Sequence, residues 1–215
     1  MKDILHYGIF LLVLSALAGI GLHGVNELTK ERIAVAQRRN LADGQKQIFA
    51  RAATFSEEKH FPMAQGSGTY YEVYSSSGAL IGYELLTAKQ GYQSLITVLT
   101  GVTTNGVLTG IKVLTQAETP GLGAEVEAIP ASGTLWQALA GLFRSGTDKK
   151  AAAGPVVPPF QAQFSGKRIE QLAVVKQPDP QRIEALSGAT ITSAAVTKAV
   201  REPLEALMAH LRGRH

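Results

Sequence analysis

An apolar run near the N-terminus constrains this 215-residue chain more than any other feature. The run extends from Ile4 to Leu22, contains no charged residue, and consists mainly of Leu, Ile, Ala and Val. As an α-helix it would span about 28 Å, close to the hydrocarbon thickness of a bilayer. Because no face of such a helix is polar, a buried core helix of a soluble domain is disfavoured. The sequence therefore predicts a transmembrane anchor over residues 1–24.

A cleaved signal peptide is the alternative interpretation of this run. Lys2 would form its basic region and Ala16-Leu17-Ala18 its small-residue cleavage site. The apolar residues continue past that site to Leu22, which favours a retained anchor. The flanking charges give little information about orientation. The basic residues that follow the run are mixed with acidic ones, and the positive-inside rule would place that side in the cytoplasm.

The remaining chain predicts an α+β domain with a mainly antiparallel sheet and flanking helices. Residues 25–52 show a helical pattern, and we expect residues 25–69 to connect the anchor to a domain over 70–211. Within that domain the sequence predicts two hairpins, a short strand and a terminal helix that Pro203 should kink. The hairpins are Tyr70–Tyr74 with Ala79–Leu86, and Leu95–Val102 with Val107–Leu114 around an Asn-Gly turn; the strand is Leu172–Val175 and the helix Thr192–Leu211.

A segment at about 127–159 is predicted to be an insertion in this domain. It contains a helical pattern over Thr134–Arg144, followed by a Gly-, Ala- and Pro-rich stretch over Ser145–Pro159. Such a composition is typical of a surface linker.

Composition excludes several kinds of chemistry. The chain has no cysteine, so it has no thiolate nucleophile, no disulfide and no cysteine-bound cluster. Its five histidines do not fall in metal-ligand spacings, and we expect no metal site. The net charge of +4 is spread along the chain without interleaved aromatic residues, so no nucleic-acid partner is expected. No GxGxxG fingerprint for a nicotinamide cofactor follows a strand.

Two segments differ from ordinary folding sequence. The first is Glu118-Thr119-Pro120-Gly121-Leu122-Gly123, whose glycines allow a tight loop that can approach a ligand, although composition alone favours a simple turn. The second is Ser187-Gly188-Ala189-Thr190-Ile191-Thr192-Ser193, a hydroxyl cluster before the terminal helix. A helix N-terminus favours an anionic group such as phosphate. From the residues alone, an anion site and an N-cap formed by Thr192 or Ser193 explain this segment equally well.

Taken together, these segments and the hairpins resemble the FMN-binding domain of the RnfG (RsxG) family. That family provides the G subunit of the Rnf ion-translocating oxidoreductase complexes, and its domain is shared with the C subunit of the Na⁺-translocating NADH:quinone reductase. The resemblance covers about residues 70–205, and the single N-terminal span matches the family's layout. Two motif positions depart from the family: Glu184 stands where Asp is usual, and Gln116 where His is frequent.

The resemblance implies the following cofactor site. FMN is attached covalently, through its phosphate, to the hydroxyl of Thr190, and a flavin transferase performs the attachment. The surrounding cofactor-binding residues are then Ser187, Gly188, Ala189 and Thr192 in the same segment, Glu118, Thr119, Pro120, Gly121, Leu122 and Gly123 near the isoalloxazine, and Lys167 in Phe164-Ser165-Gly166-Lys167, a further family-like segment.

The resemblance also implies an electron-transfer subunit without a catalytic site of its own. Its partners would be the other membrane subunits of an Rnf-type complex, with the soluble domain on the periplasmic side of the bacterial inner membrane. The alternatives are the C subunit of the quinone reductase, a membrane-anchored flavin-binding regulatory or sensory module, and an anchored scaffold that has lost its flavin.

Overall fold

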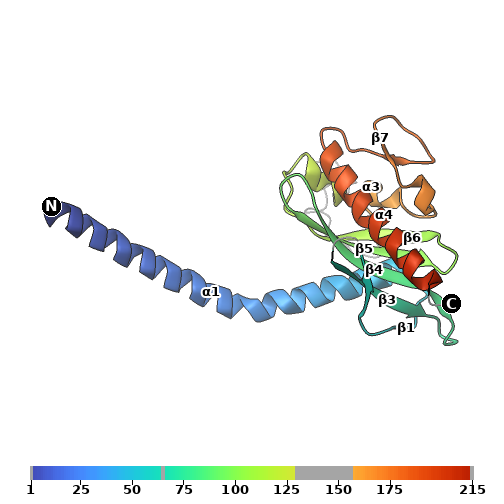
Figure 1. Cartoon of the computed structure of the whole chain (residues 1–215), viewed down its shortest axis with the longest axis horizontal. Helices are drawn as coiled ribbons and strands as arrows, with labels where there is room; N and C mark the ends of the chain where they lie inside the picture. Colours follow the sequence, from blue (N-terminus) through green and yellow to red (C-terminus); the bar gives the residue numbers. More distant parts are fainter. Residues whose placement is uncertain (1, 64–65, 129–156, 214–215) are drawn as a thin grey trace, which may run out of the picture. The chain divides into compact units, whose positions relative to one another are not determined.

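The computed structural model describes residues 2–63, 66–128 and 157–213. It contains two compact units, Met1–Ala42 and Asp43–His215. The first unit is part of one long helix, α1, which extends from Lys2 to Ile48 (Figure 1). The second unit is an α+β domain, as the sequence predicts. The predicted helix at 134–144 and most of the predicted insertion lie outside the described residues.

Helix α1 joins the predicted anchor and the predicted connecting helix without a break. Among the described residues, α1 is the one helix that is long and apolar enough to cross a membrane. Its apolar side chains face outward: Leu12 is 69% exposed and Ile20 is 70% exposed. Such exposed apolar side chains along a helix are what a membrane-facing surface requires.

The structure differs from the expected helical connection over 25–69 after Ile48. Two short strands lie in that range, β1 (Thr54–Phe55) and β2 (Lys59–Pro62). Both pair antiparallel with β3 (Ser67–Tyr74), one after the other along its edge. Strands this short carry too few apolar residues to show a period-two pattern. Their pairing with β3 defines them, and that is a tertiary feature.

Both predicted hairpins are confirmed, with three of the four strands longer than predicted. Strand β3 pairs with β4 (Leu80–Gln90), and β5 (Leu95–Thr103) pairs with β6 (Leu108–Thr115). The Asn-Gly turn is closed by a hydrogen bond from the Gly106 N–H to the Thr103 carbonyl at 3.0 Å. The main sheet has the order β1-β3-β4-β5-β6, with β2 also on β3.

Short elements connect the sheet to the C-terminal helix. The chain forms the 3₁₀ turn η1 (Gly123–Val126), the single-turn helix α3 (Pro159–Ala162) and a second 3₁₀ turn, η2 (Ile169–Gln171). The predicted strand at 172–175 is reduced to β7 (Val174–Val175), which pairs in parallel with β8 (Ile183–Glu184). Helix α4 then extends from Thr190 to Arg212.

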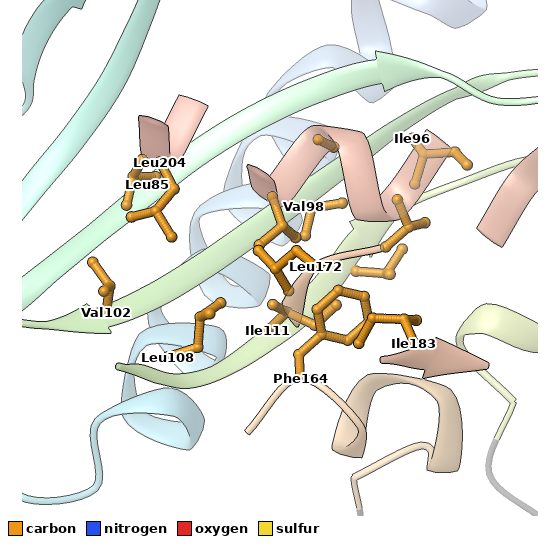
Figure 2. Packing of buried hydrophobic residues seen from close by; sticks show 14 of the residues in the cluster. Leu85, Ile96, Val98, Val102, Leu108, Ile111, Phe164, Leu172, Ile183 and Leu204 are labelled. Carbon is orange, nitrogen blue, oxygen red and sulfur yellow. The ribbon is translucent and has the colours of Figure 1, made fainter. Parts of the chain in front are cut away.

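The main core lies between α4 and one face of the sheet (Figures 1 and 2). Alternate residues of β4, β5 and β6 point to this face, as strand geometry requires. Buried side chains from the segment before α4 close the core at one end. Members labelled in Figure 2 are Leu85, Ile96, Val98, Val102, Leu108, Ile111, Phe164, Leu172, Ile183 and Leu204.

Pro203 lies inside α4 and removes one helical hydrogen bond, which a residue of the sheet replaces. Proline has no N–H, so the carbonyl four residues earlier, that of Ala199, loses its helical donor. The hydroxyl of Thr87 on β4 donates to the Ala199 oxygen at 2.7 Å instead. Both residues are buried, so this bond both satisfies the carbonyl and fixes α4 on the sheet.

This geometry predicts a coupling between Thr87 and Pro203. Thr87→Val should lower the free energy of unfolding by about 1–3 kcal/mol, because a buried carbonyl loses its donor. In a Pro203→Ala background position 203 regains a backbone N–H that can serve the same carbonyl, so the cost of Thr87→Val should shrink. Denaturant unfolding of the four proteins of this double-mutant cycle measures the difference. Equal costs in both backgrounds would show that Thr87 does not replace the missing donor.

Candidate functional site

The two unusual sequence segments meet in the folded domain. The hydroxyl of Thr192, in the first turn of α4, donates to Glu118 Oε2 at 2.6 Å. Thr192 is 2% exposed and Glu118 6% exposed, so the bond is shielded from water. The loop of residues 118–123 and the segment of residues 187–193 therefore form one site, although 74 positions separate the bonded residues.

A third segment joins them through the same carboxylate. Glu118 Oε1 accepts hydrogen bonds from the backbone N–H groups of Gln93 and Ser94 and from the Ser94 hydroxyl, at 2.8–3.0 Å. The backbone N–H of Tyr92 donates to Oε2 at 3.2 Å. This turn joins β4 to β5, so one side chain ties together the turn, the loop and the start of α4.

These donors determine the charge of Glu118. Burial alone would raise the pKa of this carboxyl group. The hydrogen bonds, led by those from the Thr192 hydroxyl and the Ser94 N–H, outweigh burial and lower the pKa to about 2. Glu118 is therefore ionised at neutral pH, and both of its oxygens are occupied by protein donors. Its role in the site is to position the surrounding backbone.

Two glycines allow the segments to approach so closely. A Cβ added at Gly123 would lie 2.7 Å from the Thr192 hydroxyl and 2.8 Å from Glu118 Oε2. Gly188 has a φ of +74°, which disfavours other residues, and an added Cβ there would lie 2.9 Å from Leu122 Cδ2. The loop and the hydroxyl segment are thus in direct contact at two places.

The hydroxyl groups of the 187–193 segment divide into buried and exposed ones. Thr192 and Ser193 are buried, and Ser193 donates to the Ala189 carbonyl at 3.0 Å and accepts from the Leu186 N–H at 3.0 Å. Ser187 and Thr190 are exposed, and Thr190 is the first residue of α4. No side chain caps α4, so the N-cap interpretation of Thr192 or Ser193 is wrong. Their hydroxyls hold the loops together.

Thr190 consequently presents its side chain at an open helix N-terminus. The first turn of α4 carries no acidic residue, and its first N–H groups have no acceptor within the helix. A phosphate group on the Thr190 hydroxyl would lie beside these donors and the positive end of the helix dipole. The chemistry of this position therefore fits a phosphodiester.

Exposed apolar side chains occur on the segments that meet at this helix start. Outside α1, the described residues include six large hydrophobic side chains that are exposed, and four of them belong to the three segments that Glu118 joins. Sequence reasoning includes Leu122 but misses the turn that carries Tyr92. We call these four the apolar surface: Tyr92 (71% exposed), Leu95 (56%), Leu122 (45%) and Ile191 (59%).

The other predicted site residues have different positions. Thr119, Pro120 and Gly121 are exposed in the loop, where the Thr119 hydroxyl donates to Gln93 Oε1 at 2.9 Å, and Ala189 is buried below the helix start. The ammonium group of Lys167 is directed to the Pro180 carbonyl, at 2.6 Å. Within the part of the chain that the structure describes, no hydrogen bond joins Lys167 to Glu118 or to Thr192.

The two departures from the family pattern also have visible structural roles. Gln116 accepts a hydrogen bond from the Glu118 N–H at 2.8 Å, so it supports the backbone of the site. The backbone N–H of Glu184 donates to Gln163 Oε1 at 2.7 Å, which links β8 to the segment after α3. The Glu184 side chain is exposed.

The described residues contain a cavity of about 850 Å³ elsewhere in the domain, between α4 and strands β3 and β4. Its lining includes residues 67–69, 86–89 and the face of α4 from Lys198 to Ala206, and it contains neither motif. The same residues show no group of three or more His, Asp or Glu side chains that could hold a metal ion.

Comparison with known proteins points to the same region. A family model described as the FMN-binding domain matches residues 91–205, more than half of the chain. The chain is 29% identical to the G subunit of the Na⁺-translocating ferredoxin:NAD⁺ oxidoreductase complex of Acetobacterium woodii, over 95% of this chain and 91% of that protein. It is 25% identical to the G subunit of an ion-translocating oxidoreductase complex of Methanosarcina acetivorans, over 95% and 94% of the two chains.

A further relative and a solved structure are also similar. The corresponding G subunit of Pseudomonas aeruginosa is 28% identical, over 90% of this chain and 84% of that protein. Among solved structures, NqrC of Shewanella oneidensis matches with a TM-score of 0.46 and 19% identity, covering 76% of this chain and 73% of that one.

The hydrogen bonds to Glu118 predict a pH-dependent contribution to stability. Because its pKa falls from 4.5 to about 2 on folding, the contribution is present above about pH 4.5 and is lost as the pH falls toward 2. Glu118→Gln should lower the free energy of unfolding by about 1.5–3 kcal/mol at pH 7. The difference from wild type should shrink below about pH 4.5.

Denaturant unfolding between pH 3 and 8 tests this. Glu125→Gln is a matched control, because Glu125 is an exposed carboxylate in the same loop region. It should change stability little at any pH. A Glu118→Gln difference that is as large at pH 3 as at pH 7 would show that the ionised carboxylate is not the stabilising species.

Proposed function

Because the chain belongs to the FMN-binding domain family, we propose that it is a membrane-anchored electron-transfer subunit that carries FMN covalently on Thr190. The observation that carries this proposal is the exposed Thr190 side chain at the open N-terminus of α4. The neighbouring Thr192 and Ser193 hydroxyls are buried and engaged within the protein. Thr190 is thus the reachable threonine of the segment.

Three groups of this chain would hold the cofactor. The free N–H groups of the first turn of α4 would bind the phosphodiester oxygens. Ser187, exposed two residues before the Ala189 N-cap position, offers a further hydroxyl beside them. The apolar surface, whose four members all lie within the matched range 91–205, would cover part of the flat isoalloxazine ring.

In this arrangement the cofactor and the protein have different roles. Bound flavin supplies the redox chemistry, by accepting and passing on electrons. The protein supplies a tether, an apolar support and a fixed backbone, which Glu118 maintains through its bonds to three segments. A covalent tether prevents loss of a cofactor that lies on an exposed surface.

The proposed setting is an ion-translocating oxidoreductase complex of the Rnf type. Its support is the set of relatives that are named as G subunits of such complexes and that this chain matches over nearly its whole length. Other membrane subunits would then be its redox partners, and a flavin transferase would load Thr190 during maturation. The candidate span in α1 agrees with membrane anchoring. A flavin-binding sensory module has no specific feature of the described residues in its favour.

The acceptor assignment predicts a sharp mutational result. When the chain is co-expressed with a flavin transferase, the wild type should gain the mass of one covalent FMN and fluoresce in a denaturing gel. Thr190→Val should do neither, because it lacks the hydroxyl that forms the ester. Thr190→Ser is the matched control, because it retains a hydroxyl, and it should be loaded. A fluorescent Thr190→Val protein would refute the assignment.

The proposed orientation is tested separately with reporter fusions. With the domain in the periplasm, alkaline phosphatase fused after residue 213 should be active in cells, because that enzyme folds only outside the cytoplasm. A cytoplasmic reporter at the same position should be inactive. The opposite pair of results would place the domain in the cytoplasm, on the side that the flanking charges favour weakly.

A further inference from the structure

Glu84 on β4 is a buried carboxyl group that the flavin site does not use. Its exposed fraction is 0%, and neither of its oxygens makes a hydrogen bond of good geometry in the described chain, although the Gln45 side chain lies near it. A buried polar group without a partner is costly, and a buried charge without one is far more so. An apolar residue would avoid this cost, so the presence of Glu84 requires an explanation.

The position of Glu84 places it on the sheet face opposite the main core. Its neighbours Leu85 and Thr87 point to α4, and successive residues of a strand point to opposite faces. Its partners across the strands are Tyr71 on β3 and Gly101 on β5. Glu84 therefore faces the element that covers this second side of the sheet.

That element is the C-terminal end of α1, together with Phe49, which belongs to the same compact unit as the sheet. Two glycines beside Glu84 leave room for this end of the helix. A Cβ at Gly82 would lie 2.8 Å from the Phe49 ring, and one at Gly101 would collide with Ile48 and lie 2.9 Å from Phe49. The last turn of α1 is thus packed directly over the carboxyl group.

We infer that Glu84 is a proton-binding site that controls whether the end of α1, residues 43–49, stays docked on the sheet. With its proton the side chain is neutral and fits the closed contact. Without the proton it is an ion that needs water, and water can reach it only when the helix end leaves the sheet. Release would lengthen the connection between the membrane helix and the domain by the residues that undock.

The electrostatics of the site support this inference. Burial raises the pKa of Glu84 to about 8, and the nearby Gln45 amide offsets only part of that rise. Tyr71 faces Glu84 from β3. Burial, and to a smaller extent the Glu58 carboxylate, raises the pKa of the Tyr71 phenol above its ordinary value, so the phenol stays neutral. Charged groups on the elements that cover this face include Asp43 and Lys46 on α1, both exposed, and Lys112 on β6, whose stem would meet a Cβ at Gly44.

Linkage gives the size and sign of the effect. The docked state holds the proton up to about pH 8, whereas a released, hydrated carboxyl group loses it near its ordinary value of 4.5. Between these values the docked state binds one more proton than the released state. The docking equilibrium constant should therefore fall tenfold for each pH unit in this range and become constant above about pH 8.

Hydrogen exchange of the full chain in detergent micelles tests this proposal. A helix end that leaves its packing surface frays, so the amides of residues 45–52 report release. Their protection factors should fall about tenfold per pH unit between pH 5 and 8 in the wild type and stay constant in Glu84→Gln. Amides of β5 should remain better protected at every pH, because they open only with the domain.

Glu58→Gln is the control, since it removes the other carboxylate near Tyr71 and should keep the wild-type pH dependence. Three results would overturn the inference: protection in the wild type that does not change with pH, an equal fall in Glu84→Gln, or loss of the fall in Glu58→Gln. Exchange of residues 45–52 at the same rate as β5 would also overturn it, because the helix end would then not open by itself. The wild-type series decides the question even if a variant folds poorly.

Discussion

The hydrogen bond between Glu118 and Thr192 is the contact on which the rest of the site depends. It joins a loop that follows the sheet to the first turn of the C-terminal helix, across 74 residues of sequence. The same carboxylate accepts from the turn between β4 and β5. With these three segments fixed, Thr190 is exposed, whereas Thr192 in the same helical turn is buried. Both follow from how the first turn of α4 packs: Thr192 points to Glu118 and Thr190 is exposed.

Two buried carboxyl groups in this domain illustrate opposite solutions to the same physical problem. Glu118 is surrounded by donors, stays ionised, and has a pKa of about 2. Glu84 makes no hydrogen bond of good geometry in the described chain, and its burial raises the pKa to about 8. The first group is a permanent structural anion beneath the proposed flavin site. The second is the group that we infer to bind and release a proton beneath the end of α1.

Sequence patterns predicted the features that depend on local chemistry. The apolar run of α1, the hairpin around Asn105-Gly106 and the periodic face of α4 each follow from spacing or turn preference. The strands β1 and β2 escaped prediction because their pairing with β3, and not their composition, defines them. The site was predicted in part. Its two motifs could be recognised, but the role of Glu118 and the contribution of Tyr92 depend on contacts between distant segments.

The central claim is that burial excludes the Thr192 and Ser193 hydroxyls, which leaves Thr190 as the exposed threonine of the segment. The most direct measurement is fragment mass spectrometry of the flavin-loaded wild-type protein, which locates the modification on a single residue of the 187–193 peptide. We predict FMN on Thr190 in every loaded molecule, with Ser187, Thr192 and Ser193 unmodified. FMN on Thr192 would contradict this, because the hydroxyl that binds Glu118 would then have to be free to react.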